Sequence, residues 1–241
     1  MHDGRCGQHP PARGPARKNS TLLQYINFSK MTTFVPRKRA CRRVPLEKKL
    51  LLVSANPIDT RPLQLDREIR EIEAAIGRAR HGNAIKIHRL QGLRVADLKQ
   101  ALLDFRPTLV HFCGHGYPDG IALVGEDDKT QLVKFEPLAR LFGMFGNRIE
   151  CVFLNACHTA GQSRCISKYI RKLVCMNGAI EDDTAIRFAA DFYAGMGAGM
   201  NIDFSFRWAR TSMAVDDAPC QDIPSLFTGR PIGRWQQPAG Y

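Results

Sequence analysis

The sequence alternates short apolar runs with segments of helical periodicity, and this alternation limits the folds that the chain can adopt. The runs are rich in β-forming residues and are bounded by Gly, Pro or polar residues, as is typical of buried strands. They cover residues 49–54, 85–90, 109–113, 150–154 and 173–176. Helical patterns occupy residues 65–79, 95–105, 137–145 and 182–196, and a further helix is expected after Cys157. This order predicts an α/β fold with a doubly wound, mainly parallel sheet flanked by helices.

One pair of strands interrupts the alternation. Residues 121–124 and 131–133 are apolar runs joined by the polar stretch 125–129. Two strands joined by a short polar connection of this kind form a β-hairpin. We therefore expect a hairpin inserted directly after the strand that leads to His115 and Gly116, with the acidic residues 126–128 at its solvated tip.

The positive charge of the chain is concentrated at its N-terminal end. The first 50 residues carry 12 Lys and Arg against 2 acidic residues, whereas the whole chain carries 35 against 23. We expect a basic, disordered arm over residues 1–46, a domain over residues 47–210, and a Pro/Gly-rich tail with little order over residues 211–241. Because the domain is nearly neutral, nucleic acid is not an expected partner beyond weak contacts of the arm.

Targeting signals and cysteine usage indicate a cytoplasmic protein. No apolar run approaches the roughly 20 residues of a membrane-spanning helix, and the first 20 residues lack the apolar segment of a signal peptide. The eight cysteines include no CxxC pair, so free thiols in a reducing compartment are expected rather than a disulfide scaffold. Two interpretations of the arm stay open: translation starts at Met31, or the Arg-rich arm is a mitochondrial transit peptide.

Two of the predicted strands end in residues that can carry out chemistry. The run 109–113 leads to His115 and Gly116, and the run 150–154 leads to Cys157. The carboxyl ends of parallel strands share one edge of a sheet, so His115 and Cys157 would face each other if their strands are neighbours. A histidine can deprotonate a thiol, and a helix beginning after Cys157 would favour the thiolate. The backbone N–H groups of Gly116 and Cys157 could then bind an oxyanion.

Two other interpretations of these residues compete with catalysis. In one, Cys157 is a buried strand-end thiol and His115 a hydrogen-bonding turn residue. In the other, a metal is bound by a set drawn from His111, Cys113, His115, Cys157 and His158. The spacing of this set matches no zinc pattern, and Gly114 interrupts the strand that would align its first members. We therefore expect neither a metal nor another cofactor.

The motifs His-Phe-Cys-Gly-His-Gly and Val-Phe-Leu-Asn-Ala-Cys resemble the two signature segments of CHAT domains, which are caspase-like peptidases related to separases, caspases and gingipains. The likeness runs from about Leu50 to Arg210. It implies a caspase-like fold, with His115 as the catalytic histidine, Cys157 as the nucleophile that forms the acyl-enzyme, and Gly116 in the oxyanion hole.

The implied function is that of a cysteine endopeptidase that cleaves a polypeptide substrate in signalling or defence, with a protein activator or regulator as a further partner. The alternative is a non-catalytic interaction module of the same fold, or an inactive fragment of a larger CHAT protein. The resemblance also places Asp182 where separase-like and gingipain-like relatives hold an acidic residue that binds a basic P1 side chain. In the competing interpretation, Asp182 or Asp183 only caps the helix that follows.

Overall fold

The computed structural model describes residues 47–217 and 220–229. The predictions made for residues 1–46, including the start at Met31, and for residues 230–241 lie outside the described residues.

The described part is built on a six-stranded sheet in the order β2-β1-β3-β7-β8-β9. The strands are β1 (Lys48–Ala55), β2 (Ile85–Leu90), β3 (Leu109–Gly114), β7 (Cys151–Asn155), β8 (Lys172–Met176) and β9 (Pro224–Thr228). The first five are parallel, and β9 runs antiparallel to β8. The chain moves from β1 outward to β2 and then returns past β1 to β3. The sheet is therefore doubly wound and mainly parallel, which confirms the predicted fold class.

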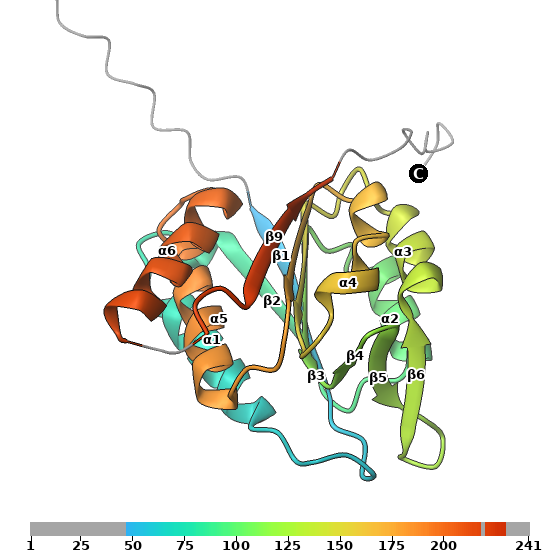
Figure 1. Ribbon diagram of the computed structural model, residues 1–241. Helices are drawn as coiled ribbons and strands as arrows, with labels where there is room; N and C mark the ends of the chain where they lie inside the picture. The colour runs from blue at the N-terminus through green and yellow to red at the C-terminus, as the bar shows by residue number, and fades with distance from the viewer. Residues whose placement is uncertain (1–46, 218–219, 230–241) are drawn as a thin grey trace, which may run out of the picture. The chain divides into compact units, whose positions relative to one another are not determined.

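Helices cover both faces of the sheet (Figure 1). One face carries α1 (Leu65–Arg78), α5 (Asp182–Gly197) and α6 (Ile202–Val215), and the other carries α2 (Val95–Asp104), α3 (Phe135–Gly143) and α4 (Ala160–Ser163). Single 3-10 turns lie at Gly82–Ala84 and Ile166–Lys168. None of the helices in the described ranges is long and apolar enough to cross a membrane.

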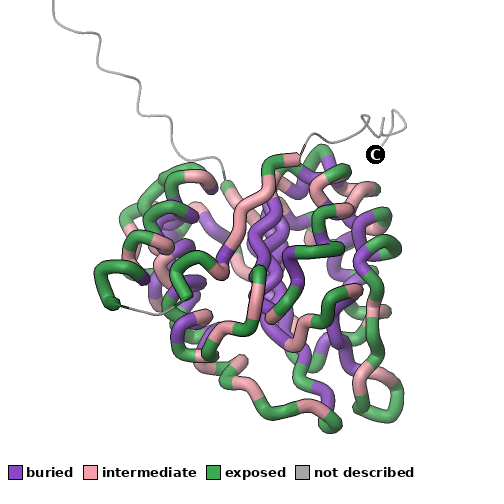
Figure 2. Tube along the Cα trace, viewed as in Figure 1, coloured by how far each residue is buried: buried purple, intermediate pink, exposed green. Residues whose placement is uncertain are grey.

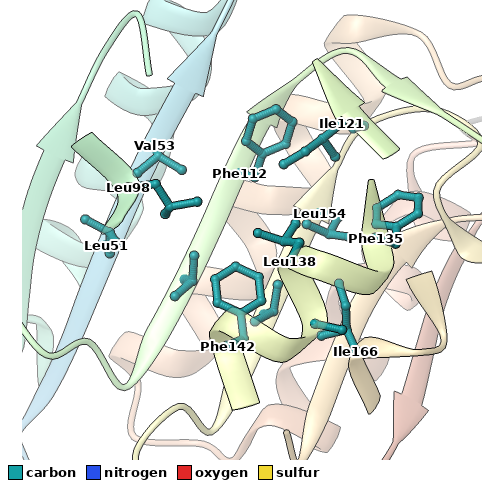
Figure 3. Packing of buried hydrophobic residues seen from close by; sticks show 14 of the residues in the cluster. Leu51, Val53, Leu98, Phe112, Ile121, Phe135, Leu138, Phe142, Leu154 and Ile166 are labelled. Carbon is teal, nitrogen blue, oxygen red and sulfur yellow. The ribbon is translucent and has the colours of Figure 1, made fainter. Parts of the chain in front are cut away.

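The sequences of the central strands are continuous apolar runs because both faces of the sheet are covered by helices. Every residue of β3 and β7 is buried, and Figure 2 shows this buried centre between exposed outer surfaces. Successive side chains point to opposite faces. Leu51 and Val53 pack with Phe112 and Leu154 against the layer of α2 and α3 (Figure 3), whereas the alternate residues of each strand pack against α1 and α5. Helices on both faces thus bury the strands completely, as is typical of a parallel sheet.

The strand register places the functional residues at one edge. Cys113 in β3 lies beside Ser54 of β1 on one side and Asn155 of β7 on the other. The three strands therefore end level with one another. The residues that follow β3 and β7 emerge side by side at the carboxyl edge of the sheet.

The predicted hairpin is present as part of a small antiparallel sheet. It consists of β4 (Gly116–Tyr117), β5 (Gly120–Val124) and β6 (Thr130–Lys134). Sequence patterns identified β5 and β6, and the two-residue strand β4 adds the chain directly after His115 to the same sheet. The hairpin therefore begins inside the candidate site.

The prediction of little order beyond residue 210 is wrong for the described residues there. Helix α6 continues to Val215, and β9 extends the central sheet. The apolar residues that α6 buries follow a helical period, namely Ile202, Phe206, Ala209 and Met213. Pro224 begins the edge strand β9, where a residue without an N–H is tolerated.

Candidate active site

A pocket at the carboxyl edge of the sheet gathers the residues that the sequence singled out. His115, Gly116, Cys157 and Asp182 all line it. They come from the ends of β3 and β7 and from the first turn of α5. The segment 63–65 and Glu68, at the start of α1, close the pocket from the side of β1. The pocket thus lies at the carboxyl ends of β3 and β7, next to the boundary between β1 and β3 where the strand order reverses, and ligands of open α/β sheets usually bind at this edge.

The ring of His115 is fixed by the backbone of a distant segment. Its Nε2 lies 2.8 Å from the carbonyl oxygen of Arg61. A carbonyl oxygen can only accept a hydrogen bond, so Nε2 carries a proton in this arrangement. In the neutral ring, Nδ1 is then the nitrogen with a free lone pair. The tautomer that can take a proton through Nδ1 is therefore selected by Arg61.

Gly116 brings the end of β3 into contact with the turn that carries Cys157. A Cβ atom at Gly116 would lie 2.3 Å from the carbonyl oxygen of Cys157 and 2.6 Å from the methyl group of Thr159. No residue other than glycine fits there without a shift of the backbone. The two strand ends are thus packed directly against each other.

The N–H of Gly116 is not used within the hairpin. Ala122 donates its N–H to the carbonyl oxygen of His115 at 3.0 Å, and Gly116 pairs with Ile121 at the next position. Hydrogen-bonded and non-hydrogen-bonded pairs alternate along an antiparallel ladder, so Gly116 belongs to a non-hydrogen-bonded pair. Its N–H therefore points away from β5 and is available to a ligand.

Cys157 lies two residues beyond the end of β7 and is half-buried. Its Sγ is 3.9 Å from the carbonyl oxygen of Ile180. The next residue, His158, adopts a positive φ of 57° and is exposed, and its N–H donates to the carbonyl of Gly178 at 3.3 Å. The backbone therefore turns sharply after Cys157, and the side chain of His158 lies at the surface.

The helix expected after Cys157 is present, but it is only a single turn long. Helix α4 has four residues and begins at Ala160. The dipole of a single turn is small, so α4 gives little support to the predicted stabilisation of a Cys157 thiolate by a helix N-terminus. The left-handed residue His158 lies between Cys157 and α4, which begins three residues after the thiol.

Asp182 is the first residue of α5, and its carboxylate forms no hydrogen bond or ion pair with any residue that the structure describes. The capping position belongs to Glu181, whose side chain does not cap. Asp183 points elsewhere, because its Oδ1 lies 2.5 Å from an Nη atom of Arg67. Of the two aspartates considered from the sequence, only Asp182 lines the pocket.

A buried polar network below the pocket was missed from the sequence. Oε1 of Glu68 lies 2.9 Å from Nε2 of His111 and accepts a hydrogen bond of 2.6 Å from the side-chain amide of Asn155. The hydroxyl of Tyr193 lies 3.2 Å from Nδ1 of His111. Burial raises the pKa of Tyr193, so this hydroxyl keeps its proton and donates a hydrogen bond to Nδ1 of His111. One signal could have revealed the network: Glu68 occupies a core-facing position of an otherwise apolar helix stripe.

The structure does not bring together the metal set considered from the sequence. His111 and Cys113 point below the sheet edge toward Glu68, with ligand atoms within 4.8 Å of one another, whereas His115 and Cys157 line the pocket. The oxygen and nitrogen that Glu68 and His111 would offer are already bonded to each other. The arrangement fits a hydrogen-bonded core network.

Comparisons with known proteins identify a family and a structural neighbour. The family model described as the CHAT domain matches residues 13–226. No curated protein matches the chain. The crystal structure of the Arg-specific cysteine proteinase gingipain R superposes with a TM-score of 0.56 at 11% sequence identity, over 78% of this chain and 48% of that one. The chain therefore spans about half the length of this neighbour, and the likeness concerns the fold.

Proposed function

Because the chain belongs to the CHAT domain family, we propose that it is a cysteine endopeptidase in which His115 and Cys157 form the catalytic pair. The observation that carries the proposal is the state of His115 within the pocket. Its Nε2 is bonded to the carbonyl of Arg61, which leaves Nδ1 as a base, and a half-buried thiol lines the same pocket. A nucleophile, a base and a group that orients the base are the three parts that such chemistry requires.

The proposed reaction starts with transfer of the Cys157 thiol proton to Nδ1 of His115. The thiolate attacks the carbonyl carbon of the scissile peptide bond, and the oxygen of the tetrahedral intermediate receives hydrogen bonds from the N–H groups of Gly116 and Cys157. The imidazolium then protonates the leaving amine as the C–N bond breaks. Water, deprotonated by the same histidine, hydrolyses the thioester and restores the thiol.

For specificity we propose a basic P1 residue held by Asp182. A carboxylate without a protein partner in a substrate pocket favours a cationic ligand, which can form a charge-assisted hydrogen bond with it. The structural neighbour is described as Arg-specific, and this agrees with the proposal. The carboxylate of Asp182, which has no partner among the described residues, is the feature of this chain that supports it.

Labelling with an activity-based probe tests the proposal. An acyloxymethyl ketone with an Arg side chain at P1 should modify Cys157 in the wild-type chain, and mass spectrometry of the tryptic peptides locates the adduct. Cys157→Ala should abolish the adduct, and His115→Ala should slow it strongly. A wild-type protein that resists the probe and cleaves no peptide library under any activating condition would favour the alternative, a non-catalytic interaction module.

A further inference from the structure

The segment between β1 and α1, residues 56–64, supplies the partner of the candidate base from outside the strands that carry the site. It connects the carboxyl end of β1 to the start of α1 below the sheet in Figure 1. Its member Arg61 accepts the hydrogen bond from His115. We call this segment the strap. A connection of this length keeps a single carbonyl in place only if it is anchored on both sides of that residue.

The first anchor lies on the hairpin, two residues before Arg61. Oδ1 of Asp59 accepts hydrogen bonds of 2.9 Å from both the N–H and the hydroxyl of Thr130. The neighbouring N–H of Ile58 donates to the carbonyl of Asp128 at 3.0 Å. Three hydrogen bonds therefore tie the first half of the strap to β6 and to the hairpin tip, although the two segments are far apart in the sequence.

The second anchor lies in the first turn of α1, seven residues after Arg61. Glu68 is 5% exposed, and its carboxylate joins α1 to His111 of β3 and Asn155 of β7. These are the two strands that lead to His115 and Cys157. The N-terminus of α1, and with it the end of the strap, is thus fixed to the same two strands that lead to the candidate catalytic pair.

We propose that Asp59 and Glu68 are positioning residues that hold the Arg61 carbonyl on Nε2 of His115 from opposite ends of the strap. The inference rests on the proposed function, since the two carboxylates are proposed to orient the histidine that acts as the base. In this proposal the hairpin anchors the strap, and the strap orients the histidine.

Asp59 gives the sharper test, because it is exposed and lies outside the pocket lining. Asp59→Ala should lower kcat by roughly 10- to 100-fold, by analogy with the losses that follow removal of the hydrogen-bond partners of metal-ligating histidines, with little change in KM. Asp59→Asn keeps an oxygen acceptor for Thr130 and should retain most of the activity. Asp127→Ala is the matched control, since Asp127 lies on the same hairpin and contacts Lys129 rather than the strap.

Glu68 requires a control for loss of stability. Glu68→Leu removes the acceptor that joins α1 to both strands and should lower kcat, whereas Glu68→Gln retains an oxygen for the same two donors and should restore much of it. Tyr193→Phe removes the other partner of His111 without touching α1. This variant should lose comparable stability and keep its kcat when assayed well below its melting temperature.

A spectroscopic measurement separates this inference from the proposed function. In 15N-histidine-labelled Cys157→Ala protein, Nε2 of His115 should appear protonated and hydrogen-bonded, and Asp59→Ala should abolish this single-tautomer signal. An unchanged signal in both Asp59→Ala and Glu68→Leu would overturn the inference, even if the protein is an active peptidase. A protein that cleaves nothing but loses the signal in both variants would support the strap and refute the peptidase.

Discussion

Gly116 packs against the carbonyl of Cys157 so closely that a Cβ atom at position 116 would lie 2.3 Å from that oxygen. This contact joins the ends of β3 and β7 and places the base and the nucleophile at one pocket. It also explains why the chain has glycine directly after His115. The contact is therefore a point at which stability and the proposed activity can be tested together.

Replacing Gly116 by Ala should lower both the stability of the fold and the reactivity of Cys157. The added methyl group forces the two turns apart, and overpacking of this kind costs about 1–3 kcal/mol in the free energy of unfolding. Probe labelling of Cys157 should slow markedly as well. Denaturant unfolding and labelling rates measure the two effects. Gly77→Ala is the control, because a methyl group there meets nothing within 4 Å and favours the helix; equal effects of the two substitutions would contradict the contact.

Asp182→Asn should reduce the preference for a basic P1 residue. Removing the charge weakens a charge-assisted hydrogen bond, so kcat/KM for Arg substrates should fall by roughly 10- to 100-fold. Asp183→Asn disrupts an exposed ion pair with Arg67 and should have little effect, because such pairs contribute little. A fluorogenic substrate series that varies only P1 measures both variants. A wild-type preference for acidic P1 residues would contradict the basic pocket.

The buried thiols should make the fold sensitive to alkaline pH. Burial raises the pKa of Cys175 from 9.0 to about 11. The folded state thus favours the neutral thiol, so this contribution to stability is complete below pH 9 and is lost as the pH rises through 11. The free energy of unfolding should fall by about 2–3 kcal/mol from this group alone.

Urea unfolding between pH 8 and 11.5 measures this loss of stability. Cys175→Ala should be less stable at pH 8 because of the cavity, but its stability should depend less steeply on pH. The difference between the two slopes isolates Cys175, since burial also raises the pKa of Cys113 and Cys151 in both proteins. Parallel pH profiles would show that Cys175 does not contribute.

Strand β9 should be required for full stability. A chain ending after Asp217 would leave β8 as an unpaired edge and uncover the core residues against which Leu226 packs. It would also remove the contact of Phe227 with Arg164, whose guanidinium carbon lies 4.6 Å from the ring centroid. We expect a loss of about 2–4 kcal/mol, or a melting temperature lower by roughly 5–15 °C. A chain ending after Gly229 is the control. Equal melting temperatures would mean that β9 adds nothing to the fold.

The sequence by itself determined the class of fold and the two strand ends that carry His115 and Cys157. Apolar runs bounded by turn residues are local signals, and so are the helical periods between them, which is why the strands at 109–113 and 150–154 and the hairpin could be predicted. His115 and Cys157 could be predicted as a pair because parallel strands share a carboxyl edge. Order beyond residue 210 was missed for two reasons. The helical period of α6 was overlooked, and β9 depends on pairing with β8 rather than on a strong pattern of its own.

Only the tertiary structure decided how the site is held together. The Arg61 carbonyl on His115 and the Glu68 contacts with His111 and Asn155 join residues that are 43 to 87 positions apart. A backbone carbonyl leaves no side-chain signal in a sequence, and a single buried carboxylate resembles any other residue of a helix surface. Such interactions arise from strand order and register, which bring distant segments together only once the sheet has formed.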